Sequence, residues 1–286
     1  MLKKLKRKEL ILLIAAVYAA FFMLFLCKAL FSDSLNYKVS YIAYGGVFKY
    51  HYFYIGGKKI SLYWSAHIVG LAGMVLLCWF RRKRYDYSKA FSVITALLLA
   101  VMGFIGAKLL YIFENLNKVK EKGISMNGVS FFGTVFFMPL ALLIISKIAK
   151  IDYKKYMDYC TPSGILMLTC IRTGCFLNGC CHGIFFWYNH RPVIFPSQLL
   201  ECVLDLILLY IIYSLQDKVK DGSLYVYFMG GYGILRFIVE FTRNTEATVI
   251  GLSNGHIFSI ICIVIMIVHI VIQNLEKTKT VKGEGD

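Results

Sequence analysis

The chain of 286 residues is 58% hydrophobic and only 17% charged, with a mean hydropathy of +0.64. Charged residues make up about a quarter of a typical soluble domain. Several apolar stretches here approach the roughly 20 residues with which an α-helix crosses a bilayer. The composition therefore predicts an integral membrane protein and excludes a soluble one. The net charge of +16 does not indicate nucleic-acid binding, because the basic residues stand between apolar segments.

The apolar segments predict an all-α integral membrane protein with about eight transmembrane helices. In chain order they cover residues 10–31, 60–80, 90–113, 130–149, 158–178, 197–215, 223–241 and 255–273. We expect three parts: a basic start with an extra N-terminal helix (1–36), a membrane domain (37–274) and a polar tail (275–286). The first apolar run can span a bilayer and lacks a small-residue cleavage sequence, which favours an uncleaved anchor over a signal peptide.

The positions of Lys and Arg predict the orientation. With the N-terminus in the cytoplasm, the cytoplasmic segments hold most of the 32 basic residues, as the positive-inside rule requires. Both termini are then cytoplasmic, and residues 179–196 and 242–254 lie on the outer face. One helix more or fewer would invert every segment after it.

Two arginines inside predicted helices, Arg172 and Arg236, are the most informative residues. An arginine near a helix centre costs roughly 2.5–3.5 kcal/mol on insertion scales, so such residues face a protein interior or a water-filled cavity. Two roles fit them: an intramembrane ion pair that aids packing, or a phosphate clamp, since a guanidinium offers two parallel donors to phosphate. Their presence on separate helices near the same leaflet favours the clamp.

The helix predicted at 223–241 carries more polar residues on the face of Arg236. In the segment YGILRFIVEFTRN, Glu240 and Arg243 follow Arg236 by four and seven positions, and Tyr232 precedes it by four. These spacings place all four on one helical face. Glu240 either neutralises the two arginines, or positions a substrate or takes a proton.

A second polar stripe opens the helix predicted at 197–215. In FPSQLLECVLDL, the side chains of Gln198, Glu201 and Asp205 recur at helical spacing. Such a stripe should face the protein interior rather than lipid. Glu201, close to the outer interface, is the stronger functional candidate, whereas Asp205 lies deeper and fits an ion pair with Lys or Arg.

The segment IRTGCFLNGCCHG (171–183) concentrates three of the nine cysteines. An odd number of cysteines, mostly within apolar spans, argues against a disulfide framework, and C-x4-C-C-H is not a common zinc pattern. We therefore expect no metal and no cofactor. A membrane metal or redox protein using Cys175, Cys180, Cys181 and His182 stays an alternative, as does a reactive thiol that itself accepts a lipid group.

In this order the motifs resemble those of the prolipoprotein diacylglyceryl transferases. The family's R-x-G-[NC]-F-x-N/A-G, H-P-S-Q-L-Y-E and Y-G-x-x-R-x-x-x-E-x-x-R segments are matched at 172–179, 195–201 and 232–243. A final G-x-x-S-x-G-Q segment resembles residues 251–256, with His256 in place of glutamine, and Tyr63 stands at a tyrosine that the family often uses. The resemblance covers roughly 50–273 and implies a seven-helix core, to which 10–31 is an addition.

The resemblance implies an activity and its participants. The family transfers a diacylglyceryl group from phosphatidylglycerol to the lipobox cysteine thiol in the signal peptide of a preprolipoprotein, and glycerol-1-phosphate leaves. The expected location is the bacterial cytoplasmic (inner) membrane, multi-pass, with the active site toward the outer face. The implied catalytic residues are Arg172, Arg236, Glu240 and Asn178. The implied residues that bind lipid headgroup or peptide are Arg172, Arg243, Tyr63, Tyr232, Gln198, Glu201 and Lys108.

Three positions depart from the family pattern. Phe132 stands where the S-F-H-G-G loop of the family has a histidine, Phe195 replaces the histidine of H-P-S-Q, and Lys108 replaces a frequent arginine. Phenylalanine cannot move a proton, and the sequence does not show which residue replaces the histidine. A divergent paralogue with another acceptor, an inactive member, and a membrane transporter or scaffold are therefore further alternatives.

Overall fold

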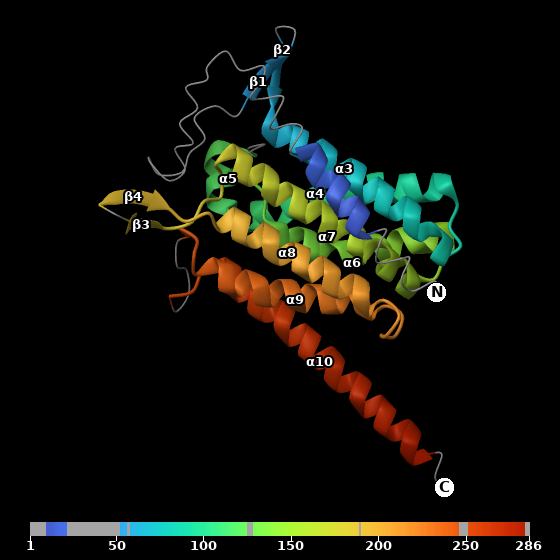
Figure 1. Ribbon diagram of the computed structural model, residues 1–286. Helices are drawn as coiled ribbons and strands as arrows, with labels where there is room; N and C mark the ends of the chain where they lie inside the picture. Colours follow the sequence, from blue (N-terminus) through green and yellow to red (C-terminus); the bar gives the residue numbers. More distant parts are fainter. Residues whose placement is uncertain are drawn as a thin grey trace.

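The computed structural model describes residues 10–21, 52–55, 58–124, 128–188, 190–245 and 251–283, which are mostly helical (Figure 1). The first long helices are α3 (Leu62–Arg81), followed by the 3-10 turn η1 (Arg82–Arg84), and α4 (Lys89–Glu114), followed by the short α5 (Leu116–Lys122). The chain continues with α6 (Phe131–Ala149), α7 (Tyr153–Asn178), α8 (Ser197–Leu215), α9 (Ser223–Glu240) and α10 (Asn254–Gly283). A helix at Leu10–Phe21 contributes buried residues to the same core.

The prediction of an all-α integral membrane protein is confirmed. Among the described residues, six helices are long and apolar enough to cross a membrane: α3 with η1, α4, α6, α7, α8 and α10. α9 has 18 residues and carries Arg236 and Glu240, and Leu10–Phe21 is a shorter apolar helix. Residues 22–31 of the predicted first span lie outside the described residues.

Side-chain caps explain where α4 and α7 begin. The Ser88 hydroxyl accepts a hydrogen bond from the Phe91 N–H at 3.1 Å at the start of α4, and Asp152 accepts one from the Lys155 N–H at 2.8 Å at the start of α7. Because of the Asp152 cap, α7 begins at Tyr153 rather than at the predicted residue 158. The first turn of α7 is polar, which hid it from a search for apolar runs.

Two short hairpins, which the sequence did not predict, interrupt the helices. β1 (Tyr52–Ile55) pairs antiparallel with β2 (Lys58–Ser61) directly before α3. β3 (Phe185–Tyr188) pairs antiparallel with β4 (Arg191–Ile194) in the link between α7 and α8, with Phe185 opposite Ile194. In Figure 1 the second hairpin extends beyond the starting end of α8.

The least apolar of the six spans, α7, is the most buried. Two thirds of its apolar window (67%) is buried inside the protein, against 17% for the very apolar α10. Helix α7 contacts α3, α4, α6, α8 and α9, and it therefore forms the centre of the bundle. Several of its polar side chains, among them Asp158, Thr169 and Arg172, are buried in protein, whereas the apolar surfaces of outer helices are left for lipid.

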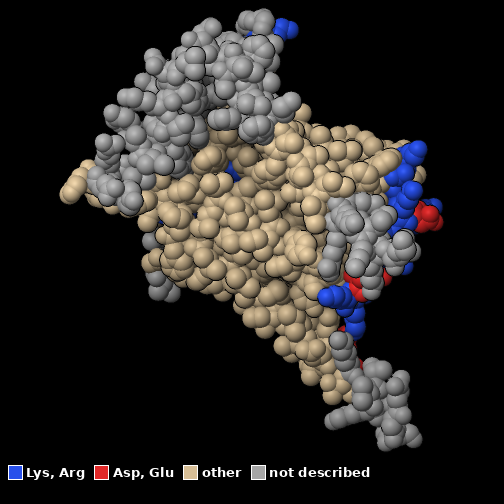
Figure 2. Space-filling model, in the orientation of Figure 1, with Lys and Arg blue, Asp and Glu red and all other residues tan. Residues whose placement is uncertain are grey.

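The two ends of the bundle differ in charge. Figure 2 shows Lys and Arg gathered at one end, with a largely uncharged flank. At this end Arg84 of η1 forms an ion pair with Asp217, which follows α8, and Asp158 accepts hydrogen bonds from the N–H groups of Gly222 and Leu224 at the start of α9. The end of α7, the start of α8 and the end of α9 meet at the opposite end, where the polar site lies.

Candidate active site

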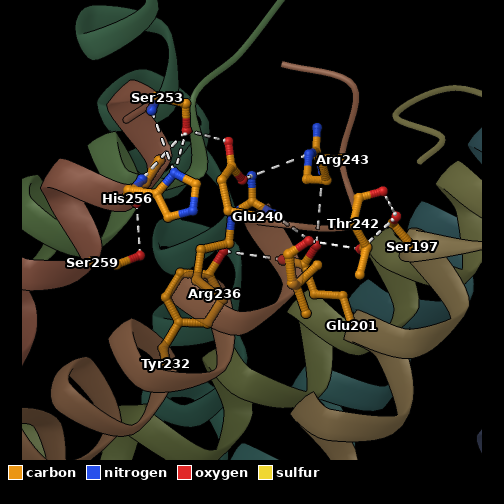
Figure 3. Close-up of polar contacts among 12 residues, drawn as sticks. Ser197, Glu201, Tyr232, Arg236, Glu240, Thr242, Arg243, Ser253, His256 and Ser259 are labelled. Atoms are coloured by element: carbon orange, nitrogen blue, oxygen red, sulfur yellow. Dashed lines mark hydrogen bonds and ion pairs between the residues drawn. The ribbon is translucent and has the colours of Figure 1, made fainter. Parts of the chain in front are cut away.

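A buried cluster of three arginines and two glutamates joins α7, α8 and the end of α9. Figure 3 labels four of its members, Glu201, Arg236, Glu240 and Arg243. Glu201 is at its centre and is fully buried. Its carboxylate lies 2.8 Å from Arg172, 3.3 Å from Arg236 and 3.8 Å from Arg243. The Tyr232 hydroxyl donates a further hydrogen bond to Glu201 Oε1 at 3.2 Å. One carboxylate from α8 therefore orders guanidinium groups from two other segments.

Glu240 is held from the other side by α10. Its carboxylate lies 2.6 Å from Arg236 and accepts a hydrogen bond from the Ser253 hydroxyl at 2.7 Å. The Nδ1 of His256 lies 3.1 Å from the same hydroxyl, so a polar chain runs from Arg236 to His256 (Figure 3). Gly255 lies against this carboxylate, because a Cβ at that position would be only 2.5 Å from the Glu240 carboxyl carbon.

The cluster carries an excess of positive charge. Three guanidinium groups face two carboxylates in contact with them, which leaves one net positive charge. The buried Nε of Arg172 has no hydrogen-bond partner among the described residues, and both ion pairs of Arg243 are as long as 3.8 Å. The arrangement can therefore accept an anion, with donors still available to hydrogen-bond it.

The cluster borders a cavity of about 1520 Å³ that is lined mainly by apolar side chains. Arg172, Arg236, Glu240 and Arg243 line its polar part. Elsewhere on its wall are apolar residues of α3 and α4 that are exposed on the outside of the bundle, among them Trp64, Ile68, Phe104 and Phe113. The cavity thus combines a cationic region with an apolar wall that reaches the lipid-facing surface.

The loop after α7 is tied to the helices that carry the glutamates. The Gly183 N–H donates to the Phe195 carbonyl at 2.9 Å, and Ser197 Oγ donates to the Thr242 carbonyl at 2.9 Å. Gly183 sits where three segments meet, since an added Cβ would clash with Ser197 Oγ and with the Thr242 and Phe195 carbonyls. Gln198 donates to the Cys180 carbonyl at 2.6 Å. This loop therefore has a fixed position beside the cavity.

Three cysteines of this segment come together at the cavity wall. The sulfur atoms of Cys175, Cys180 and Cys181 lie within 4.8 Å of one another, and all three residues line the cavity. Hydrogen bonds from the Cys175 and Cys180 thiols, with the charges of Arg243 and Arg172, hold the pKa of Cys181 well below its usual range. The eight cysteines within the described ranges are all free thiols.

A sequence model of the family described as prolipoprotein diacylglyceryl transferase matches residues 51–272. The chain belongs to this family. A diacylglyceryl transferase of Clostridium tetani, named for phosphatidylglycerol and prolipoprotein, is 27% identical over 234 residues, which are 74% of this chain and 93% of that relative. A second enzyme so named, from Clostridium perfringens, is 28% identical and covers 81% of this chain and 97% of its own length. One from Ehrlichia ruminantium is 31% identical, with 68% and 83% covered.

The structure brings most of the sequence-predicted site residues of this diacylglyceryl transferase family member together. Arg172, Arg236, Arg243, Glu201, Glu240 and Tyr232 form the contacts described above. Tyr63 and Asn178 also line the cavity. The roles of all these residues stay predictions.

Two predicted residues, Lys108 and Gln198, belong neither to the arginine–glutamate cluster nor to the cavity wall. Lys108 donates to the Gly128 carbonyl at 3.1 Å and lies over the Tyr111 ring, and the Gln198 amide holds the loop through Cys180. Neither is among the residues that line the cavity. Asp205 is fully buried, yet neither of its carboxylate oxygens has a hydrogen-bond partner within the described ranges. The expected ion pair of Asp205 is therefore not formed there.

Phe132, at the position of the family's histidine, is buried in an aromatic group beside the site. Its ring centre is 5.6 Å from that of Tyr232 and 5.5 Å from that of Phe258. The Phe132 side chain itself offers no proton acceptor at this point of the wall. The segment of Ser253 and His256 was matched as a motif, and the three cysteines were kept as an alternative metal or redox site. Neither group was predicted among the catalytic or binding residues, although the polar spacing in LSNGH was an available signal for the first.

Proposed function

We propose that the chain transfers a diacylglyceryl group from phosphatidylglycerol to the lipobox cysteine thiol of a prolipoprotein. The observation that carries this proposal is the buried cluster in which Arg172, Arg236 and Arg243 surround Glu201 at one end of a largely apolar cavity. The comparisons support the reaction, since the relatives are named for phosphatidylglycerol and prolipoprotein.

The reaction needs the charge that this cluster supplies. The sulfur of the acceptor cysteine attacks the glyceryl carbon next to the phosphate, a C–S bond forms, and the C–O bond to phosphate breaks. Glycerol-1-phosphate leaves with the electron pair of that bond, so negative charge grows on its oxygen atoms. Arg172 and Arg236 bind the phosphodiester and stabilise this charge, which is the largest single contribution that such a site makes. Glu201 and Glu240 hold the two guanidinium groups in place.

The shape of the cavity supports a lipid substrate. Acyl chains would lie along the apolar residues of α3 and α4, of which Trp64, Ile68 and Phe104 are also exposed on the bundle surface. A lipid would enter from the bilayer between these helices, with its headgroup toward the arginines. Tyr63 and Asn178, on the wall near the cluster, would contact the headgroup or the peptide.

The two ends of the bundle support an outward-facing site in a bacterial cytoplasmic membrane. The basic end, with η1 and the links α6–α7 and α8–α9, would face the cytoplasm. The arginine cluster is at the other end and would face the outside, where exported prolipoproteins arrive with the lipobox cysteine of the signal peptide near the membrane surface.

Complementation tests this proposal. The chain is expressed in a bacterium depleted of its own transferase, and a reporter lipoprotein is analysed by mass spectrometry. We expect the mass of a diacylglyceryl group on the reporter, its loss with Arg172→Ala or Arg236→Ala, and its retention with Arg84→Ala, an arginine of the basic end. An unmodified reporter in cells where the protein is inserted normally would overturn the assignment and leave a divergent member with a different acceptor.

A further inference from the structure

The three thiols beside the arginine cluster have the arrangement of a metal site. The sulfur atoms of Cys175, Cys180 and Cys181 lie within 4.8 Å of one another. Sulfur ligands of one zinc ion, each about 2.3 Å from the metal, lie roughly 4 Å apart. Small rotations of the side chains would therefore suffice to bind one ion. The spacing C-x4-C-C looks unsuitable as a linear pattern, but the fold closes it into one group.

The backbone turns sharply where these sulfur atoms come together. Helix α7 ends at Asn178, and Gly179 reverses the chain with φ of 71°. Cys181 then has φ of 58°, in the left-handed region that residues other than glycine rarely adopt. Strained conformations of this kind persist where surrounding contacts enforce them, and they concentrate at functional sites. Here the Gln198 amide and the Gly183 contacts hold the loop.

The ligand set fits a catalytic zinc ion better than a structural one. Structural zinc sites have four protein ligands, whereas catalytic sites have three and leave one position open. In the part of the chain that the structure describes, no His, Asp or Glu joins the three cysteines in one group. Cys175 is buried, Cys180 is intermediate and Cys181 is exposed, and all three line the cavity, so an open position would face the substrate.

The neighbouring charges suit such a complex. Three thiolates and a divalent zinc ion carry a net charge of −1, and a fourth thiolate makes it −2. Arg172 and Arg243 line the same cavity as the three cysteines, and they would offset this charge. Phe132 leaves the other side of the site without the proton acceptor that the family pattern has there, so the acceptor cysteine needs another route to its thiolate.

We propose that Cys175, Cys180 and Cys181 bind one zinc ion whose open position binds the acceptor cysteine as a thiolate; this inference rests on the proposed function. A thiol loses its proton when it coordinates zinc, and the proton passes to water in the cavity. The zinc-bound sulfur attacks the glyceryl carbon, the C–S bond forms and the C–O bond to phosphate breaks. The product is a neutral thioether, which is a weaker ligand than a thiolate and leaves the ion.

Metal content tests the site independently of catalysis. The full chain is purified in detergent under anaerobic, reducing conditions, stripped with a chelator and titrated with Zn²⁺ alone. We expect about one bound zinc ion per chain and its loss in Cys175→Ser and in Cys181→Ser. Cys262→Ala is the matched control, because Cys262 is a buried free thiol of α10 away from the cavity; it should bind zinc like the unaltered chain. No binding of Zn²⁺ by the unaltered chain overturns the inference.

Transfer by the same preparations separates this inference from the proposed function. We expect stripping to lower transfer at least tenfold and added Zn²⁺ to restore it, in a protein that never carried a substitution. Full transfer by the stripped protein overturns the zinc inference while the proposed function stands. The protein could instead bind one zinc ion through these cysteines and never transfer a diacylglyceryl group. That result would support the metal site, but it would overturn both the proposed function and the role of zinc in activating the acceptor thiol.

Discussion

Replacing Glu201 by glutamine should destabilise the protein far more than an exposed substitution of the same kind. The side chain keeps its shape, but the centre of the cluster loses its charge. Three guanidinium groups would then face Glu240 as the one carboxylate in contact with them. Arg172, whose ion pair in this cluster is with Glu201, would be left buried and uncompensated among the described residues.

The magnitude follows from the contacts. At an effective dielectric constant of about 20, opposite charges 2.8 Å apart attract by ~6 kcal/mol, and the desolvation of both groups offsets part of this. Removing one partner of a buried pair typically costs 3–5 kcal/mol, so we expect a loss of about 4 kcal/mol. Glu276→Gln is the control, since its pair with Lys220 is well exposed and worth at most about 1 kcal/mol.

Thermal unfolding in lipid nanodiscs measures this difference. Bilayers of phosphatidylcholine and of phosphatidylglycerol are compared, because an anionic headgroup in the cluster would return one negative charge. The deficit of Glu201→Gln relative to the unaltered protein should be smaller in phosphatidylglycerol. An unfolding midpoint that shifts no more than that of Glu276→Gln, or a deficit equal in both lipids, would refute the electrostatic reasoning.

Three further substitutions probe other contacts. Ser253→Ala removes the hydroxyl that donates to Glu240 at 2.7 Å. Because hydrogen bonds to charged groups contribute about 1.5–3 kcal/mol, the rate of transfer should fall roughly tenfold or more while the fold is retained. An unchanged rate would contradict a role for this contact. Gly183→Ala forces apart the segments that meet at this residue. A protease should therefore cut the link at 179–196 faster in this variant than in the unaltered protein. Equal cleavage rates in the two proteins would count against the clash. Asp158→Ala removes the cap of α9 at the basic end and should lower stability by about 1–2 kcal/mol while transfer per folded molecule is unchanged.

The residues that share one helix could be placed from the sequence. Arg236, Glu240 and Tyr232 are four residues apart, and helical geometry alone puts them on one face. The structure confirms that this face is buried and that Arg236 contacts Glu240 at 2.6 Å. Most helix positions were also accessible, because apolar length is a strong signal in membrane proteins, although this signal missed the polar first turn of α7.

Contacts between helices could not be placed from the sequence. Nothing in one sequence shows that Glu201 of α8 lies between Arg172 of α7 and Arg236 of α9, since this depends on how the bundle packs. The direction of the Gln198 amide, which holds the loop at Cys180 rather than lining the cavity, depends on the path of the link between α7 and α8. The three cysteines were kept from the sequence only as an alternative metal or redox site, because their meeting in space depends on the left-handed turn at Cys181.

The burial of α7 also sets an order of events during synthesis. This helix carries Arg172, whose partner Glu201 belongs to the next helix, so α7 emerges from the ribosome before the charge that neutralises its arginine. Alone in lipid it would carry part of the roughly 2.5–3.5 kcal/mol that an arginine costs at a helix centre, since Arg172 lies nearer the end of the helix. α7 should therefore stay at the translocon, or against α3, until α8 is made. A nascent chain stopped before residue 197 should insert α7 poorly, and one extended through α8 should insert it fully.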